Sequence, residues 1–169
     1  MRHIIFIMLF ILINTMTICA QEYNVPKDYK FETKEAYKTY EPQVKETIEW
    51  LLQTPLGKDT NKRKDAFKFL MDWIEGTPNV TVGLDQRIIN FISVNPEMLV
   101  PFLSGWVKYS LDNDYSKDNI QCNKAGVEAV VAFYRKNKGY LKKDGNIEKY
   151  EKLIEKGKLK EEISKRLKK

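Results

Sequence analysis

Histidine and cysteine are nearly absent from this sequence, which has one histidine, His3, and two cysteines, Cys19 and Cys122. His3 and Cys19 lie in an N-terminal stretch that we expect to be removed, so the remaining chain has no histidine and one thiol. Ser-His and Cys-His catalytic pairs, histidine-bound zinc and an internal disulfide are thereby excluded. Glycine-rich phosphate loops and paired-cysteine motifs are also missing, so we expect no cofactor and assign no catalytic residue. Cys122 is expected to be a core residue, because no histidine is present to activate it.

The N-terminus has the pattern of a secretory signal peptide. A short positive start precedes an uninterrupted apolar run over residues 4–13, and Ala20 offers a small residue for cleavage. We therefore predict a signal peptide over residues 1–20 and a bacterial protein that is exported, either periplasmic or secreted. The alternative is a lipoprotein modified at Cys19, against which Ile18 argues, because lipoprotein signals place a small residue before the cysteine.

Charge is scarce in residues 88–107, where Glu97 is the one charged residue and most positions are apolar. Burial of apolar area drives folding, so this stretch should form the centre of the core. It predicts two buried helices, residues 84–93 and 96–111, with a kink at Pro101 in the second. Its uninterrupted apolar runs are too short to cross a bilayer, so we expect no transmembrane span in the mature chain.

Apolar residues recur at helical spacing through most of the mature chain, which predicts an all-α fold of six to eight helices. We expect one compact helical domain over residues 21–169, either an orthogonal bundle or a short array resembling a helical repeat. Residues 21–32 lack a helical period and should form an extended aromatic arm packed on the body, and residues 138–169 should form basic C-terminal helices. The other predicted helices cover residues 33–40, 42–53, 119–137 and a segment capped near residue 60 that ends at residue 75.

One short motif occurs twice. The pattern acidic-Trp-x-x-x-Thr-Pro is found at Trp50 and at Trp73, and it is not found at Trp106. A helical repeat would give such a pattern, each tryptophan filling the seam to the next helix pair. The alternative is that Thr-Pro is a common helix stop, and the sequence leaves both interpretations open.

Basic residues outnumber acidic ones, 29 to 23, and the excess is concentrated in residues 138–169. Residues 21–137 are almost neutral, which argues against nucleic acid as a partner. The narrow apolar stripes of the C-terminal segment suit either a solvated helix pair or peripheral contact with an anionic surface, such as lipid headgroups or an acidic polymer. The residues expected to make such a contact are Lys142, Lys143, Lys158, Lys160, Lys165 and Arg166.

A polar segment between two predicted helices resembles the start of a calcium loop, because oxygen donors occur at alternate positions. Two departures weaken the match: Lys117 stands where such a loop has glycine, and Asn123 stands where it has a bidentate glutamate. The alternative is an ordinary helix end followed by a capping residue. The candidate calcium ligands are Asp112, Asp114, Ser116 and Asp118.

Two classes of function remain. The first is a non-enzymatic exported binding protein with an unknown protein or polymer partner outside the cytoplasm, favoured by the aromatic arm and the absence of a catalytic motif. The second is a carboxylate-based hydrolase acting on an envelope or extracellular polymer, which would need two facing carboxylates. The candidate carboxylates near apolar residues are Glu49, Asp72, Glu97 and Glu128. Glu97 also suits the first turn of a helix, where negative charge is favoured.

Overall fold

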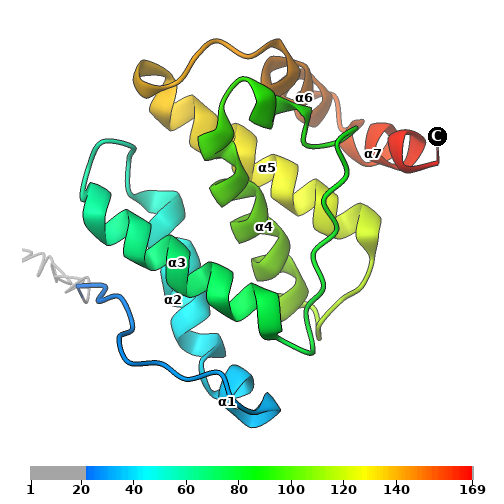
Figure 1. Ribbon diagram of the computed structural model, residues 1–169. Helices are drawn as coiled ribbons and strands as arrows, with labels where there is room; N and C mark the ends of the chain where they lie inside the picture. The colour runs from blue at the N-terminus through cyan, green and yellow to red at the C-terminus, as the bar shows by residue number, and fades with distance from the viewer. Residues whose placement is uncertain (1–21, 169) are drawn as a thin grey trace, which may run out of the picture.

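Helices account for all the regular secondary structure of residues 22–168, the part of the chain that the computed structural model describes. These residues form a compact domain in which the predicted all-α fold is confirmed. The α-helices are α1 Lys34–Thr39, α2 Glu41–Gln53, α3 Thr60–Gly76, α4 Leu99–Asp112, α5 Asn119–Asn137, α6 Gly145–Glu155 and α7 Leu159–Leu167 (Figure 1). Three short 3₁₀ helices are η1 Asn90–Ser93, η2 Pro96–Met98 and η3 Lys138–Tyr140. The predicted signal peptide, with its cleavage site and Cys19, lies outside the described residues.

Helices α4 and α5 cross at the centre, with α1 to α3 on one side of them and α6 and α7 on the other (Figure 1). Glycines let the two central helices approach closely. A Cβ atom on Gly105 would lie 2.5 Å from the Ala125 carbonyl oxygen, and one on Gly126 would lie 2.8 Å from the Phe102 ring. Glycine, which has no Cβ atom, is therefore required at both positions for this packing.

The core has two parts that share α4. On one side of α4, α2 and α3 bury apolar side chains together with Val107, namely Val44, Ile48, Leu51, Ala66, Phe69, Leu70 and Trp73. On the other side, α5, α6 and α7 close over the central stretch, burying Phe102, Trp106, Val127, Val130, Ile147, Tyr150, Leu159 and Ile163. None of the helices within residues 22–168 has the length and apolar character that crossing a membrane requires.

The helix predicted over residues 84–93 is wrong. Asp85 accepts hydrogen bonds from the amides of Ile88 and Ile89 in a turn, and helical geometry appears only in the 3₁₀ helix η1. This segment is apolar, and Ile88 and Ile89 are buried, but its β-branched residues have low helix propensity. The Ser93 hydroxyl also donates to the Asn90 carbonyl at 2.9 Å, a local hydrogen bond that competes with helix formation. Apolar content predicted burial correctly, but it did not determine backbone conformation.

The kink predicted at Pro101 is also wrong. Residues 96–98 form η2, and α4 begins only at Leu99, so Pro101 lies in the first turn of the α-helix. A first-turn amide has no intrahelical acceptor, so the N–H that proline lacks costs nothing there. Helix α4 then runs as one α-helix to Asp112.

The two Trp-x-x-x-Thr-Pro motifs share a local geometry but not a structural role. In each, the threonine is an extended residue after the helix, and its amide donates to the tryptophan carbonyl, Thr54 to Trp50 at 2.9 Å and Thr77 to Trp73 at 3.0 Å. Trp73 is fully buried, whereas Trp50 is partly exposed. The shared motif is therefore a helix stop, and the two tryptophans do not fill equivalent seams.

Candidate functional site

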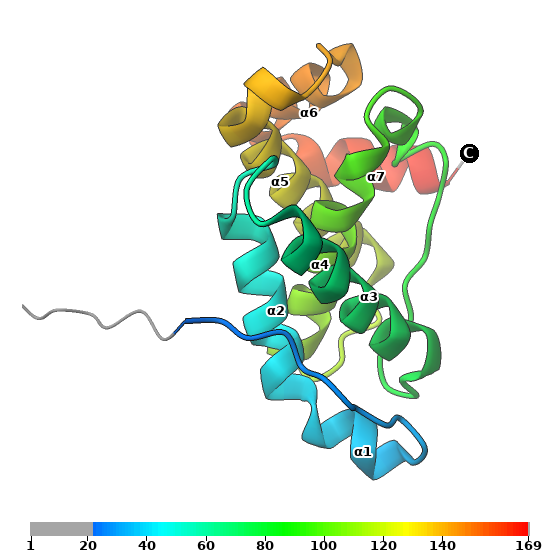
Figure 2. The ribbon, with the colours of Figure 1, turned by 60° about the vertical axis from the view of Figure 1, so that its left-hand side comes forward.

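Residues 22–32 form the expected extended arm, which runs across α2 on its way to α1 (Figure 2). Aromatic side chains attach it to the body. The Tyr23 ring stacks on Trp50 with centroids 5.1 Å apart, and the Tyr29 ring meets the edge of the buried Phe69 at 4.9 Å. Such pairs add to the stability that burial alone provides. Aromatic contacts therefore hold both the start and the middle of the arm against α2 and α3.

Two tyrosine hydroxyls add polar attachments to the arm. The buried Thr47 hydroxyl donates to the Gln43 carbonyl at 2.7 Å, so Tyr23 is the donor in its 2.9 Å hydrogen bond to the Thr47 oxygen. The pKa of the Tyr23 hydroxyl is raised, mainly by burial. Tyr29 donates to the Asp72 carboxylate at 2.6 Å, and hydrogen bonds from Lys68 and then Tyr29 lower the pKa of that carboxyl.

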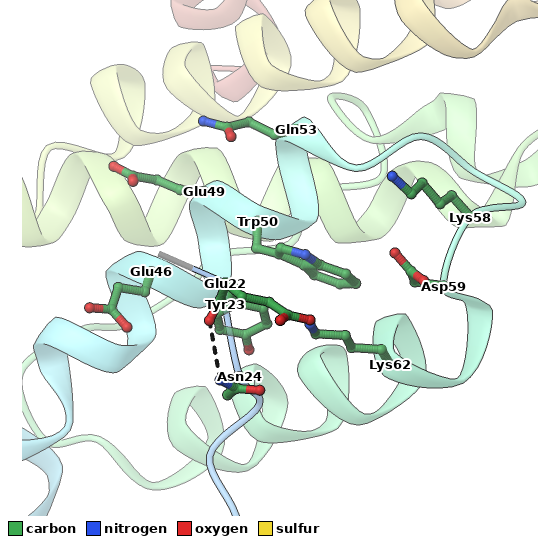
Figure 3. Close-up of a pocket in the computed structure, with 10 residues that line it drawn as sticks. All are labelled: Glu22, Tyr23, Asn24, Glu46, Glu49, Trp50, Gln53, Lys58, Asp59 and Lys62. Carbon is green, nitrogen blue, oxygen red and sulfur yellow. Dashed lines mark hydrogen bonds between the residues drawn. The ribbon is translucent and has the colours of Figure 1, made fainter. Parts of the chain in front are cut away.

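A hollow of about 640 Å³ lies between the start of the arm, α2 and the start of α3. We call it the arm groove (Figure 3). The arm supplies residues 22–24, α2 supplies one face, and the segment around Asp59 supplies the remainder. Its lining residues are Glu22, Tyr23, Asn24, Glu46, Glu49, Trp50, Gln53, Lys58, Asp59 and Lys62.

Charge in the arm groove is mostly negative. Its four carboxylates are all on exposed residues, and within the described chain none of them has a salt bridge. Lys62 places its ammonium nitrogen 5.5 Å from the Tyr23 ring centroid and 5.4 Å from that of Trp50. The groove therefore combines a partly exposed aromatic pair, solvated carboxylates and an ammonium group held by the rings.

The groove continues along the arm into a second hollow of about 540 Å³. Asn24 and Lys62 line both hollows, which makes them adjoin. The second hollow is completed by Val25, Lys27 and Asp65. Together the two hollows follow the arm from Glu22 to Lys27, which gives space for an extended ligand.

Arg63 fixes the end of α2 from which Trp50 projects. Its guanidinium donates to the carbonyl oxygens of Leu51, at 3.1 Å, and Thr54, which have no acceptor role inside the helix. It also lies 5.9 Å from the Trp50 ring centroid and 5.4 Å from that of Phe133. Burial lowers the pKa of this guanidinium. Arg63 thereby ties the aromatic wall of the groove to the core.

The candidate calcium ligands have other partners. Asp112 accepts hydrogen bonds from Lys45 and Lys108, both at 2.7 Å, and Asp118 caps α5 by accepting from the amides of residues 120 and 121. Asp114 adopts a left-handed conformation, and the Ser116 hydroxyl accepts from the Asp118 amide at 3.3 Å. Over residues 22–168, no group of three or more His, Cys, Asp or Glu side chains is placed to hold a metal ion. The calcium site stays a prediction that these contacts do not support.

The four candidate carboxylates lie on four different elements, and among them Glu49 alone lines the arm groove. Asp72 is engaged by Tyr29 and Lys68, Glu128 pairs with Lys124 at 2.7 Å, and Glu97 is exposed in η2. Sequence patterns contain no signal for the other charged groove residues, because their proximity depends on the course of the arm; these are Glu22, Glu46, Asp59, Lys58 and Lys62.

The predicted C-terminal contact residues divide into two groups. Arg166 is engaged inside the protein: it donates to Glu162 at 2.9 Å, to the Arg87 carbonyl at 2.7 Å and to the Tyr150 hydroxyl at 3.0 Å. The lysines are exposed, and of these Lys143 alone approaches a carboxylate in the described chain, Glu148 at 4.0 Å. The exposed lysines of this set are Lys142, Lys143, Lys158, Lys160 and Lys165.

Cys122 lies in the core, as expected. It is 1% exposed, and its thiol approaches the Ser116 carbonyl at 3.6 Å. Burial raises the pKa of the thiol to about 11, which keeps it protonated and unreactive near neutral pH.

Comparison with known proteins adds no assignment, because no protein-family model, no curated protein and no solved structure matches this chain.

Proposed function

We propose that this chain is an exported, non-enzymatic binding protein of the bacterial envelope or exterior, and that its ligand occupies the arm groove. The observation that carries this proposal is the Tyr23–Trp50 pair, whose rings remain partly exposed in the lining of a large hollow. Aromatic side chains beside a concave surface provide contact area at low conformational cost and commonly dominate binding energy. The polar lining supplies the groups that would orient a ligand.

The export part of the proposal rests on the apolar run at residues 4–13 and the small residue at Ala20. Fractionation of cells that express the full chain with a C-terminal tag tests it. Recovery outside the cytoplasm with Gln21 as the first residue supports export. Recovery in the cytoplasm with residues 1–20 still attached contradicts it.

A carboxylate-based hydrolase is the second candidate, because four carboxylates line the groove. Hydrolysis of a glycosidic bond by two carboxyl groups needs one that is kept protonated by an apolar, buried environment. All four groove carboxylates, Glu22, Glu46, Glu49 and Asp59, are on exposed residues. The solvent exposure of these carboxylates therefore favours a binding protein over a carboxylate-based hydrolase.

The test compares the mature protein with Trp50→Ala, using Glu97→Gln as a control at an exposed residue outside the groove. Each protein is immobilised and washed with an envelope extract. We expect Trp50→Ala to retain at least about tenfold less of the extract's ligand than the wild type does. We also expect the ligand that is eluted from the wild type to be chemically unchanged. Equal retention by Trp50→Ala would overturn the groove as the binding site, and consumption of the bound polymer would favour the hydrolase.

A second contact, with an anionic surface, is proposed for the lysines of the C-terminal helices. It is supported by the exposure of Lys142, Lys158, Lys160 and Lys165 and by the absence of salt bridges to them within residues 22–168. Most carboxylates of α6 and α7 are already paired, Glu151 with Arg135 and Glu162 with Arg166 among them. Such a contact would hold the protein near its ligand without a membrane span.

A further inference from the structure

Lys62 occupies a position beside the Tyr23–Trp50 pair that suits any cation. Its ammonium nitrogen lies at similar distances, 5.5 and 5.4 Å, from the two ring centroids. A cation is attracted to the face of an aromatic ring, and tryptophan is the strongest such partner. Within the described chain no salt bridge joins Lys62 to a carboxylate, so the aromatic contact is its principal attachment in the groove. A cation carried by a ligand could take over the same contact.

The remaining charges of the groove favour a cationic ligand. The lining contains four carboxylates, on Glu22, Glu46, Glu49 and Asp59, and two ammonium groups, on Lys58 and Lys62. Because none of the four has an ion pair in the described structure, a ligand would not have to displace an internal partner to reach them. Movement of Lys62 away from the rings would leave the lining more negative still.

The backbone of the arm favours an extended peptide over a small amine. Among the described residues, no backbone–backbone hydrogen bond joins residues 22–32 to any other segment, and side chains provide the attachments identified above. The Glu22 carbonyl accepts a hydrogen bond from the Asn24 side chain at 3.2 Å, and no other hydrogen bond to the backbone of residues 22–32 is found in the described chain. An extended segment of this kind can accept a second extended chain beside it. The two adjoining hollows follow this segment from Glu22 to Lys27.

We propose that the arm groove takes a lysine- or arginine-rich segment of another polypeptide in extended form, and that one of its cationic side chains replaces Lys62 at the Tyr23–Trp50 pair. This inference rests on the proposed binding function and specifies the chemistry of the ligand. Lys62 then acts as an internal competitor that the ligand must displace.

The test titrates the mature protein with a short peptide of alternating lysine and serine, blocked at both ends. A peptide with glutamine in place of lysine is the neutral control. Binding is followed by tryptophan fluorescence. Trp73 and Trp106 are buried, so the change in fluorescence should come from Trp50 and should disappear in Trp50→Phe. We expect saturable binding of the lysine peptide that weakens as salt is raised, and no binding of the glutamine peptide.

Matched lysine variants make the test specific to the aromatic pair. Lys62→Met removes the competing cation, whereas Lys64→Met removes the same charge from an exposed position on α3 outside the groove. We expect Lys62→Met to bind the lysine peptide about two- to fivefold more tightly than Lys64→Met does. The double variant Glu46→Gln, Glu49→Gln should bind it at least about fivefold more weakly than the wild type.

Several results would overturn the inference. They are failure of the lysine peptide to bind, equal affinity of the Lys62 and Lys64 variants, or equal binding of the lysine and glutamine peptides. A Trp50-dependent response to the glutamine peptide or to a neutral oligosaccharide would refute the cationic ligand while leaving the groove as a binding site. Trp50-independent retention in the extract experiment would instead refute the binding site itself.

Discussion

Tyr23 stacks on Trp50 with ring centroids 5.1 Å apart and an interplanar angle of 30°, and this contact turns an N-terminal arm into one wall of a groove. The two residues come from separate segments, an extended arm and the helix α2. Tyr23 also donates to the buried Thr47, so the same side chain supplies an aromatic and a polar attachment. This one tyrosine therefore holds the start of the arm against α2, beside the groove.

Two variants at Tyr23 separate its two attachments. Tyr23→Phe keeps the ring and removes the hydrogen bond to Thr47, which should lower the free energy of unfolding by about 0.5–1.5 kcal/mol. Tyr23→Ala removes the stacking as well and should cost about 1–3 kcal/mol. Chemical denaturation measures both losses. Equal stability of the wild type and Tyr23→Ala would show that the arm is not attached through this residue.

Trp106 is expected to be essential to the core. It is 3% exposed on α4, and its indole N–H donates to the Thr81 carbonyl at 3.1 Å. Trp106→Ala should lower the free energy of unfolding by about 3–5 kcal/mol, because it removes a large buried side chain and leaves a cavity. Thermal or chemical unfolding tests this, and a loss below about 1 kcal/mol would contradict the core role.

Acid should weaken the attachment of the arm at Tyr29. Hydrogen bonds from Lys68 and Tyr29 lower the pKa of Asp72 in the folded state below its usual 3.8. A carboxyl group with a lowered folded pKa contributes stability that is present above its unfolded pKa and is lost as pH falls through the folded pKa. The free energy of unfolding of the wild type, measured by chemical denaturation, should therefore fall below about pH 4. Asp72→Asn should be less stable already at neutral pH and should lose less stability over the same acid range; an equal acid loss in this variant would contradict the assignment.

The C-terminal lysines should bind anionic vesicles in a salt-dependent way. Exposed charges are screened over about 3 Å at 1 M salt, so binding to phosphatidylglycerol vesicles at low salt should disappear there. Removal of residues 138–169 is unsuitable as a test, because Ile147, Tyr150 and Ile163 are buried in the core.

A triple variant replaces that truncation. The variant has glutamine in place of Lys158, Lys160 and Lys165, and the control has glutamine in place of three other exposed lysines, Lys34, Lys38 and Lys117. The variant should bind the vesicles more weakly than the control does. Cosedimentation gives the bound fractions. Equal binding by the two triple variants, or binding that survives 1 M salt, would refute the contact.

The helices with both a clear period and end signals could be predicted from the sequence. Helix α5 runs over residues 119–137 as predicted, and α1 begins after the Thr33 cap. Residues 84–93 could not, because Leu84, Ile88, Phe91 and Ile92 follow a helical period although the backbone forms a turn and a 3₁₀ helix. Local pattern determines where a helix forms only when backbone propensity and burial agree.

Most of the candidate site could not be predicted from the sequence. The sequence predicts the aromatic arm, but its motifs group Trp50 with Trp73, whereas in the fold Trp50 stacks on Tyr23. Glu22 and Asp59 come together only because the arm crosses α2, and no local spacing reports that crossing. Sequence patterns could not predict where the arm, which has no helical period, packs on the body.

The central claim is that the ligand lies between the arm and α2, and hydrogen–deuterium exchange of the mature protein with and without its bound ligand tests it most directly. The structure predicts added protection in residues 22–27, 46–53 and 58–65, and the same ligand should protect none of them in Trp50→Ala. Protection confined to α6 and α7, or spread evenly over the domain, would contradict a binding site in the arm groove.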